Sequence, residues 1–93
     1  MSRSLISNDP WCLICGDPRV EKHHIFYGSA NRAKSEKYGC WCYLCPRHHR
    51  DQKVGVHFNT RLNQELRELC QKKWEAEYGD REEFRKTFGR SYL

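Results

Sequence analysis

The clearest periodic pattern lies in the second half of the chain. Apolar residues recur at spacings of three and four from Leu62 to Trp74, which predicts a long amphipathic helix. Asn59 and Thr60 offer a cap ahead of it, and Gly79 predicts its end. We expect the apolar stripe of this helix to pack on the strands predicted below.

A shorter helix is predicted to follow. Asp80 and Glu83 have the spacing of a capping box, Phe84 and Phe88 lie four residues apart, and Gly89 follows as a stop signal. The chain is therefore expected to finish in two helices.

The first half has the shorter patterns of strands. Residues 20–27 and 38–44 are rich in β-branched and aromatic residues and each predicts a strand. The polar and basic stretch 28–37 between them predicts a loop, with at most a helical turn. Pro46 suits the first position of a short helix, which should end before Gly55.

These elements predict a small α+β fold. Residues 1–10 are expected to be a flexible leader that ends at a turn, and 11–93 a single domain in which 60–93 are a helical extension of the core 11–59. The start of the chain does not resemble a signal peptide, and no apolar run reaches the roughly 20 residues of a membrane helix. We expect a cytoplasmic protein without a membrane partner.

The composition suggests that the hydrophobic core is too small to be stable without additional cross-links. The chain has 93 residues, of which 38% are hydrophobic, and a mean hydropathy of -0.98. A chain so short and polar buries a thin core, so a bound metal or disulfides are expected to reinforce it. Without a secretion signal, the six cysteines are expected to be zinc ligands or buried thiols.

Spacing selects four residues for a structural zinc ion. Cys12 and Cys15 form a C-x-x-C pair, and Cys45 and His48 repeat the spacing at the start of the predicted short helix. The positive end of a helix favours the thiolate form of a cysteine. A rival set is open, because Cys42 and Cys45 also form a C-x-x-C pair, which would make a four-cysteine site.

The other cysteines have a plainer interpretation. Cys40 and Cys42 lie two residues apart in the predicted second strand and share a face, as small core residues would. Cys70 lies on the apolar stripe of the long helix. These three are predicted to be buried thiols.

Charge is concentrated in the half of the chain that holds most of the histidines. The net charge is +5, and up to Lys53 there are nine Lys and Arg against five Asp and Glu. A basic surface beside a metal site favours a polyanionic partner, most often nucleic acid.

Four of the five histidines form two adjacent pairs, His23-His24 and His48-His49. Neighbouring residues on a strand or helix point in different directions, so the two imidazoles of a pair can serve different sites. If His48 binds zinc, His49 is left to face the first pair.

Together these motifs resemble the HNH nuclease family, whose core is the ββα-metal fold. The resemblance covers about residues 11–59 and depends on the upstream C-x-x-C, the doubled histidine and the helix start. The segments HHIFYG at 23–28 and CPRHHR at 45–50 are most similar to small phage and mobile-element HNH proteins, which include recombination-associated nucleases.

The resemblance implies roles by position. It implies that His23 and His49 bind a catalytic divalent ion and that His24 is the general base. Many family members have another ligand four residues after the helix histidine, where this chain has Lys53. His57 could reach the ion if the short helix ends early and the chain loops back; a phosphate contact or a capping role are its alternatives.

One family feature is missing. The family places an Asn shortly before the helix, where this chain has Cys40-Trp41-Cys42. Asn31 or Asn59 is the alternative residue that could hold the loop around the general base in place.

The implied activity is hydrolysis of DNA phosphodiester bonds with Mg²⁺, Mn²⁺, Ni²⁺ or Zn²⁺ at the histidines. DNA contacts would fix position and not sequence, so low sequence specificity is expected. The resemblance implies a bacterial or phage-infected cell and a recombination or phage protein as a partner. The predicted phosphate contacts are Arg32, Lys34, Lys37, Arg47 and Arg50.

Two other functions fit parts of the sequence. The first is a zinc-stabilised module that binds nucleic acid without cutting it. The second is a protein-interaction module whose surface is the long helix from Asn59 to Tyr78. His24 separates the first from a nuclease, since a binding module has no use for a second unpaired histidine on that strand.

Overall fold

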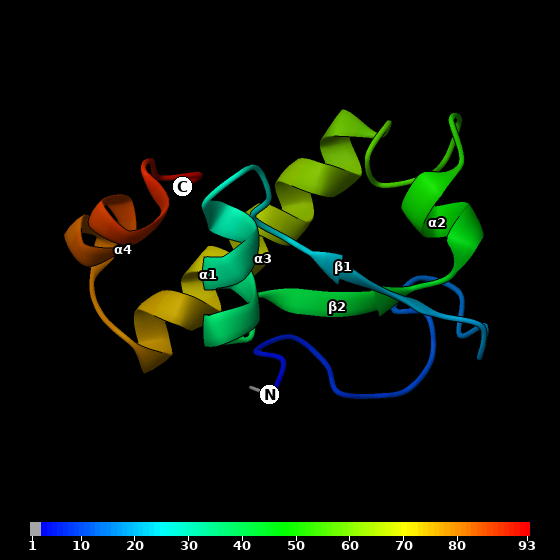
Figure 1. Ribbon diagram of the computed structural model, residues 1–93, viewed down its shortest axis with the longest axis horizontal. Helices are drawn as coiled ribbons and strands as arrows, with labels where there is room; N and C mark the ends of the chain where they lie inside the picture. Colours follow the sequence, from blue (N-terminus) through cyan, green and yellow to red (C-terminus); the bar gives the residue numbers. More distant parts are fainter. Residues whose placement is uncertain (1–2) are drawn as a thin grey trace.

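A two-stranded sheet and four helices make up the computed structural model, which describes residues 3–93 (Figure 1). The predicted α+β class is confirmed. In chain order the elements are β1 (Glu21–His24), α1 (Asn31–Tyr38), β2 (Trp41–Leu44), α2 (Pro46–Arg50), α3 (Thr60–Glu77) and α4 (Arg81–Phe88).

The two strands form an antiparallel hairpin. His23 is opposite Cys42 and His24 is opposite Trp41. Because side chains alternate along a strand, Glu21 and His23 share one face of β1 and the side chain of His24 lies on the other. The two histidines of the first pair are therefore separated by the sheet.

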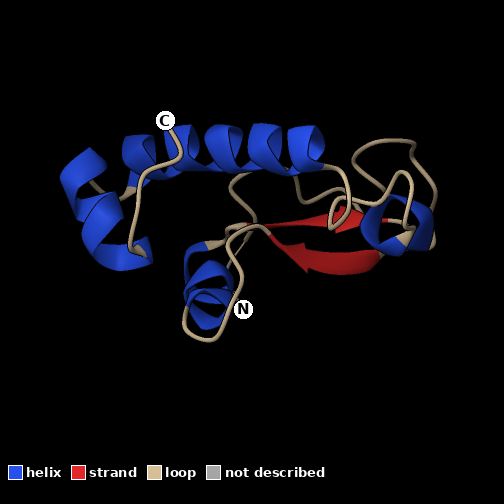
Figure 2. Ribbon diagram, turned by 90° about the horizontal axis from the view of Figure 1, so that it is seen from above, coloured by secondary structure: helices blue, strands red, loops and turns tan. Residues whose placement is uncertain are grey.

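The helices α1, α2 and α3 lie around this hairpin, and α4 packs against α1 and α3. α3 runs along one side of the strands and α1 lies on the other, while α2 follows the end of β2 (Figure 2). The core lies between these layers. Its fully or almost fully buried residues include Ile25, Phe26, Leu44, Val56, Leu66, Cys70, Trp74, Phe84 and Phe88.

Both C-terminal helices agree with the sequence pattern. The side chain of Asn59 caps α3 by accepting a hydrogen bond from the Leu62 amide, at 3.0 Å. Asp80 caps α4 in the same way through the Glu83 amide, at 2.9 Å. α4 ends at Gly89, whose φ of 93° is the left-handed conformation that glycine adopts without strain.

Residues 28–37 differ from their prediction, since most of this stretch is helix α1 and not a loop. The helix has no apolar stripe. It is held by Ser35, which is fully buried and whose hydroxyl donates to the Phe26 carbonyl at 2.6 Å and accepts from the Phe26 amide at 3.1 Å. α1 includes Tyr38 and ends at Gly39, with φ of 74°, so the second strand begins at Trp41 and not at residue 38.

The segment predicted as a flexible leader, residues 1–10, makes contacts with the rest of the domain. Residues 1–2 lie outside the described part, and residues 3–10 form no helix or strand. Ser4 is nonetheless buried and donates a hydrogen bond to the Trp41 carbonyl, and the Leu5 amide donates to the Gly39 carbonyl at 2.8 Å. The packed part of the chain therefore begins before residue 11.

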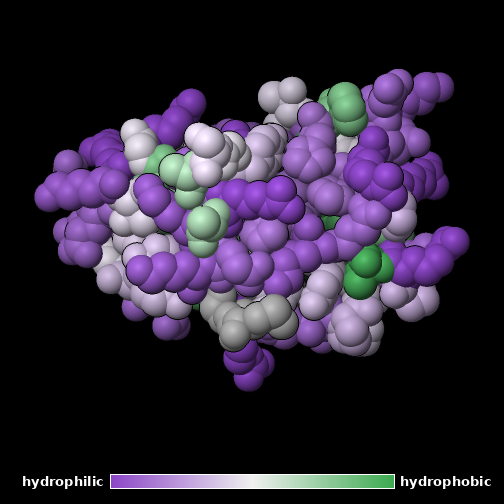
Figure 3. Space-filling model, in the orientation of Figure 1, coloured by the Kyte–Doolittle hydropathy of each residue, from purple (hydrophilic) through white to green (hydrophobic). Residues whose placement is uncertain are grey.

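The surface is mainly hydrophilic on the face drawn in Figure 3, where apolar side chains are scattered. None of the helices within residues 3–93 combines the length and the apolar character needed to cross a membrane. Apolar side chains of the hairpin and the helices fill the core, and the cysteine and histidine groups lie at its edge toward α2.

Candidate metal centres and active site

The first candidate centre joins the start of the chain to α2. One ligand atom from each of Cys12, Cys15, Cys45 and His48 lies within 4.8 Å of the others. The Cys15 and Cys45 sulfurs are 3.7 Å apart, and His48 Nδ1 lies 3.7 Å from Cys12 Sγ and 3.2 Å from Cys45 Sγ. Sulfurs on a tetrahedral zinc ion are separated by about 3.8 Å, so these four residues lie close enough to hold such an ion.

Local structure sets up this arrangement. The Cys12 amide donates to the Asp17 carbonyl at 2.9 Å, and the Gly16 amide donates to the Cys12 carbonyl at 2.8 Å, which closes the C-x-x-C turn. Cys45 is the residue ahead of α2, and Pro46 is the first residue of that helix. One ligand pair thus lies in a tight turn and the other at a helix start.

The surroundings of Cys12 favour the thiolate form of its side chain. Burial raises its pKa, but hydrogen bonds with the backbone of Cys45, Cys15 and Ile14 outweigh burial and bring the pKa to about 6. The thiolate form therefore predominates at neutral pH, and it is the form that binds metal.

The rival ligand Cys42 lies outside this group. It is fully buried, and burial, together with the charge of Cys12, raises its pKa to about 12. A hydrogen bond with Cys40, and then burial, raise the pKa of Cys70 as well. The prediction that Cys40, Cys42 and Cys70 are buried thiols is confirmed.

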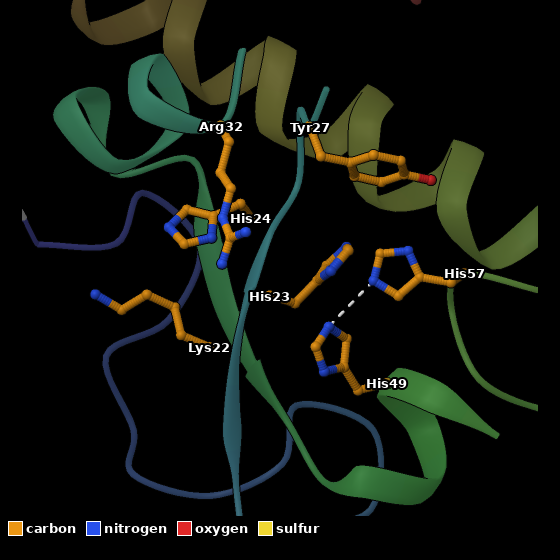
Figure 4. A pocket seen from close by; sticks show the side chains of 7 residues that line it. All are labelled: Lys22, His23, His24, Tyr27, Arg32, His49 and His57. Carbon is orange, nitrogen blue, oxygen red and sulfur yellow. Dashed lines mark hydrogen bonds between the residues drawn. The ribbon is translucent and has the colours of Figure 1, made fainter. Parts of the chain in front are cut away.

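A second group consists of three histidines from three parts of the chain. His23 of β1, His49 of α2 and His57 of the loop between α2 and α3 each offer a nitrogen within 4.8 Å of the other two. The Nε2 atoms of His49 and His57 are 3.1 Å apart. Figure 4 shows the three rings directed toward one another on one side of β1.

His23 is the most buried member, with 1% of its surface exposed. Burial, and then the nearby His57 and His49, lower the pKa of His23 to about 3, so its imidazole stays neutral. Its Nε2 makes no hydrogen bond to any of residues 3–93. A buried polar atom without a partner is unusual and fits a group that binds a cation.

Glu21 contacts the ring nitrogen of His49 that faces away from His57. Its carboxylate lies 2.8 Å from His49 Nδ1 and also accepts two hydrogen bonds from Arg50, at 2.8 and 2.7 Å. Hydrogen bonds from Arg50 and then His49 lower the pKa of Glu21, which keeps it ionised. An ionised carboxylate accepts the Nδ1 proton, so the lone pair of His49 is on Nε2, the atom that faces His57.

Sequence reasoning did not include Glu21. The signal was its position, two residues before His23 and thus on the same face of the strand.

His57 reaches the group because the chain turns back after α2. The Gly55 amide donates to the Asp51 carbonyl at 2.8 Å, and the Val56 amide donates to the His48 carbonyl at 2.7 Å. Val56 is fully buried and anchors the loop. His57 therefore lies with His23 and His49 in a group that is close enough to hold a metal ion.

His24 lies on the opposite face of β1 from the three histidines. Its Nε2 is 3.0 Å from Glu36 Oε1, and 13% of its side chain is exposed. His24 and the three-histidine group nevertheless line one pocket at the end of the strand (Figure 4). The residues around this pocket are Lys22, His23, His24, Tyr27, Arg32, His49 and His57.

The predicted phosphate contacts have different surroundings. Arg32 lines the pocket beside His24, and Arg47 is exposed on α2. Lys34 donates to the Thr87 carbonyl at 2.6 Å, Lys37 lies over the Tyr38 ring, and Arg50 is paired with Glu21. Of the predicted phosphate contacts, Arg32 is thus the one that lines the pocket.

Neither proposed asparagine contacts His24. Asn31 donates to the Phe88 carbonyl at 3.1 Å, and Asn59 caps α3. The structure gives His24 an acidic partner, Glu36, in their place.

Comparison of the chain with protein-family models, with curated proteins and with solved structures gives no match. The features of the molecule that bear on its function are therefore the two ligand groups and the pocket.

Proposed function

We propose that this protein is a metal-dependent DNA endonuclease of the HNH type. Under this proposal the hairpin and α2 are the ββα-metal core, and Cys12, Cys15, Cys45 and His48 hold a structural zinc ion. The observation that carries the proposal is the pocket in which three convergent histidines, the base candidate His24 and Arg32 meet.

The three-histidine group would hold the catalytic ion. Its donor set fits a divalent cation, because His23 is neutral and buried and His49 is oriented by Glu21. A bound divalent ion would supply charge stabilisation to the scissile phosphate and the leaving 3′ oxygen. Mg²⁺, Mn²⁺, Ni²⁺ and Zn²⁺ are the ions to compare.

His24 would act as the general base. A neutral imidazole takes a proton from water near neutral pH. The water oxygen then forms a bond to phosphorus while the bond from phosphorus to the 3′ oxygen breaks, which leaves a 5′-phosphate end. Arg32 lines the same pocket and would contact a phosphate beside the cut.

The substrate contacts proposed here are to the DNA backbone. Arg32 and Lys37 of α1 and Arg47 of α2 would contact phosphates without reading bases. Low sequence specificity follows, and a recombination or phage protein in a bacterial cell would supply any targeting.

Plasmid nicking tests the proposal. Zinc-loaded wild type and His24→Ala are compared with Mg²⁺, Mn²⁺, Ni²⁺ and added Zn²⁺, and the variant is expected to lose about 10²- to 10⁴-fold in rate. Glu82→Ala, which removes an exposed carboxylate on α4, is the matched control and should cut like the wild type.

Two results would contradict the nuclease assignment. One is a wild type that cuts no DNA with any of the four ions, and the other is equal cutting by His24→Ala. A wild type that shifts DNA in a gel but never cuts it would support the binding module instead.

A further inference from the structure

The contact between His24 and α1 is the feature that the proposed chemistry leaves unexplained. His24 Nε2 lies 3.0 Å from Glu36 Oε1. Glu36 follows Ser35, whose buried hydroxyl both donates to and accepts from the Phe26 backbone. Since Phe26 lies two residues after His24, α1 is fixed to the chain that carries the imidazole, and the position of the Glu36 carboxylate is set with it.

Glu36 is held as a carboxylate. Lys22 Nζ lies 3.2 and 3.3 Å from its two oxygens, and the same ammonium group lies 4.3 Å above the Trp41 ring. The hydrogen bond with His24, and then the one with Lys22, lower the pKa of Glu36. Lys22 and His24 share a face of β1, so the strand itself aligns both partners of Glu36.

This contact decides which nitrogen of His24 carries the proton. A carboxylate can only accept hydrogen bonds, so the proton of the contact belongs to His24 Nε2. A neutral imidazole has one N–H, which leaves the lone pair on Nδ1. The ring is also largely buried, with 13% of the side chain exposed, so rotation away from Glu36 would break a packed contact.

We propose that Glu36 is the positioning residue of His24, which fixes the Nε2–H tautomer and directs Nδ1 to the attacking water. This inference rests on the proposed nuclease function. Glu36 is not among the residues to which the resemblance to HNH nucleases gives a role. Asn31 and Asn59 make other contacts, so Glu36 takes the bracing role expected of them. Glu36 does not touch the substrate; it acts through His24.

Nitrogen NMR of the histidines tests the tautomer without any substrate. In ¹⁵N-labelled, zinc-loaded protein at pH 8, His24 should show a protonated Nε2 and an unprotonated Nδ1. Glu36→Ala should give a mixture of both tautomers, whereas Glu36→Gln should keep the wild-type pattern because its amide oxygen still accepts a hydrogen bond. Glu82→Ala is the matched control for loss of an acidic side chain.

Nicking kinetics test the consequence for catalysis. Glu36→Ala should lower kcat by about 10- to 100-fold while KM changes by less than about twofold, since the side chain orients the base and does not bind DNA. Glu36→Gln should recover most of the lost kcat. A role limited to folding would lower the yield of active protein in both variants and leave the tautomer of the folded fraction unchanged.

The inference is overturned if wild-type His24 has its proton on Nδ1, or if folded Glu36→Ala keeps both the wild-type tautomer and the wild-type kcat. If the wild type cuts no DNA, the proposed function fails, and the nitrogen shifts still decide whether Glu36 fixes the tautomer of His24.

Discussion

At the scale of single residues, each adjacent histidine pair serves two different environments. On α2, successive residues are about 100° apart around the helix axis, so His48 faces the cysteines while His49 faces His57. On β1, alternation sends His23 to the three-histidine group and His24 to Glu36. A doubled histidine thus places two imidazoles from one short segment in two different groups of side chains.

Glu21→Ala should weaken ion binding at the three histidines. Without the carboxylate, His49 loses the partner that directs its Nε2, and affinity should fall by about 10- to 100-fold. Titration calorimetry of Ni²⁺ or Mn²⁺ into zinc-loaded protein would measure it. Glu65→Ala, which removes a carboxylate paired with Arg61 on α3, is the control. Equal affinities for Glu21→Ala and the wild type would rule out the orienting role.

Burial of neutral His23 should make stability depend on pH. The folded protein has a pKa of about 3 at His23, whereas the unfolded chain takes up the proton near 6.5. Stability is therefore present above 6.5 and is lost as pH falls toward 3, by up to about 1.4 kcal/mol per pH unit. Denaturant unfolding of wild type and His23→Gln from pH 7 to 5 would measure this slope as a difference between the proteins. A difference that stays constant with pH would contradict the buried neutral state.

At the scale of elements, periodicity and caps predicted the C-terminal helices because both signals lie in adjacent residues. α1 was missed for a physical reason. Its sequence, NRAKSEKY, has no apolar stripe, and its anchor is a pair of hydrogen bonds between Ser35 and Phe26, nine residues apart. A contact of that kind is visible only in three dimensions. Missing α1 also meant missing Glu36, the partner of His24.

Asn59→Ala should destabilise the protein by about 0.5–2 kcal/mol, because the first turn of α3 loses the acceptor for the Leu62 amide. Asn59→Asp keeps a capping oxygen and should lie much closer to the wild type. Thermal unfolding followed by circular dichroism at 222 nm compares the three proteins. A larger loss in Asn59→Asp than in Asn59→Ala would show that the side chain has another role.

At the scale of the whole molecule, the candidate zinc group connects distant parts of the chain. Cys12 and Cys15 precede the hairpin, and Cys45 and His48 follow it, so one ion would close the loop that contains both strands. Spacing predicted Cys12, Cys15 and Cys45, and the strand pattern that makes Cys42 a core residue favoured His48 over Cys42 as the fourth ligand. The two acidic partners Glu21 and Glu36 were not predictable in the same way, because acidic residues are common on surfaces and their spacing has no metal signature.

Removal of zinc by a strong chelator should unfold the domain, seen as loss of helical circular dichroism. The ligand set itself can be tested through zinc content per chain. Cys45→Ser should lose the ion and the fold, whereas Cys42→Ala should keep one zinc ion and cost only the small cavity left by a thiol. Loss of zinc from Cys42→Ala with retention in a His48→Ala variant would assign the four-cysteine site.

The pairing of β1 with β2 has a further consequence for how the chain tolerates change. His23 is opposite Cys42 and His24 is opposite Trp41. If one residue were deleted just before β1 and the strand slipped by one position, His24 would replace His23 in the ligand group, and Ile25 would take the place beside Glu36. The shifted chain would still present an imidazole to the ion but none to the water. Under the proposed function, a single-codon deletion there should therefore separate metal binding from cleavage, because the alignment of the strands decides which histidine reaches which group.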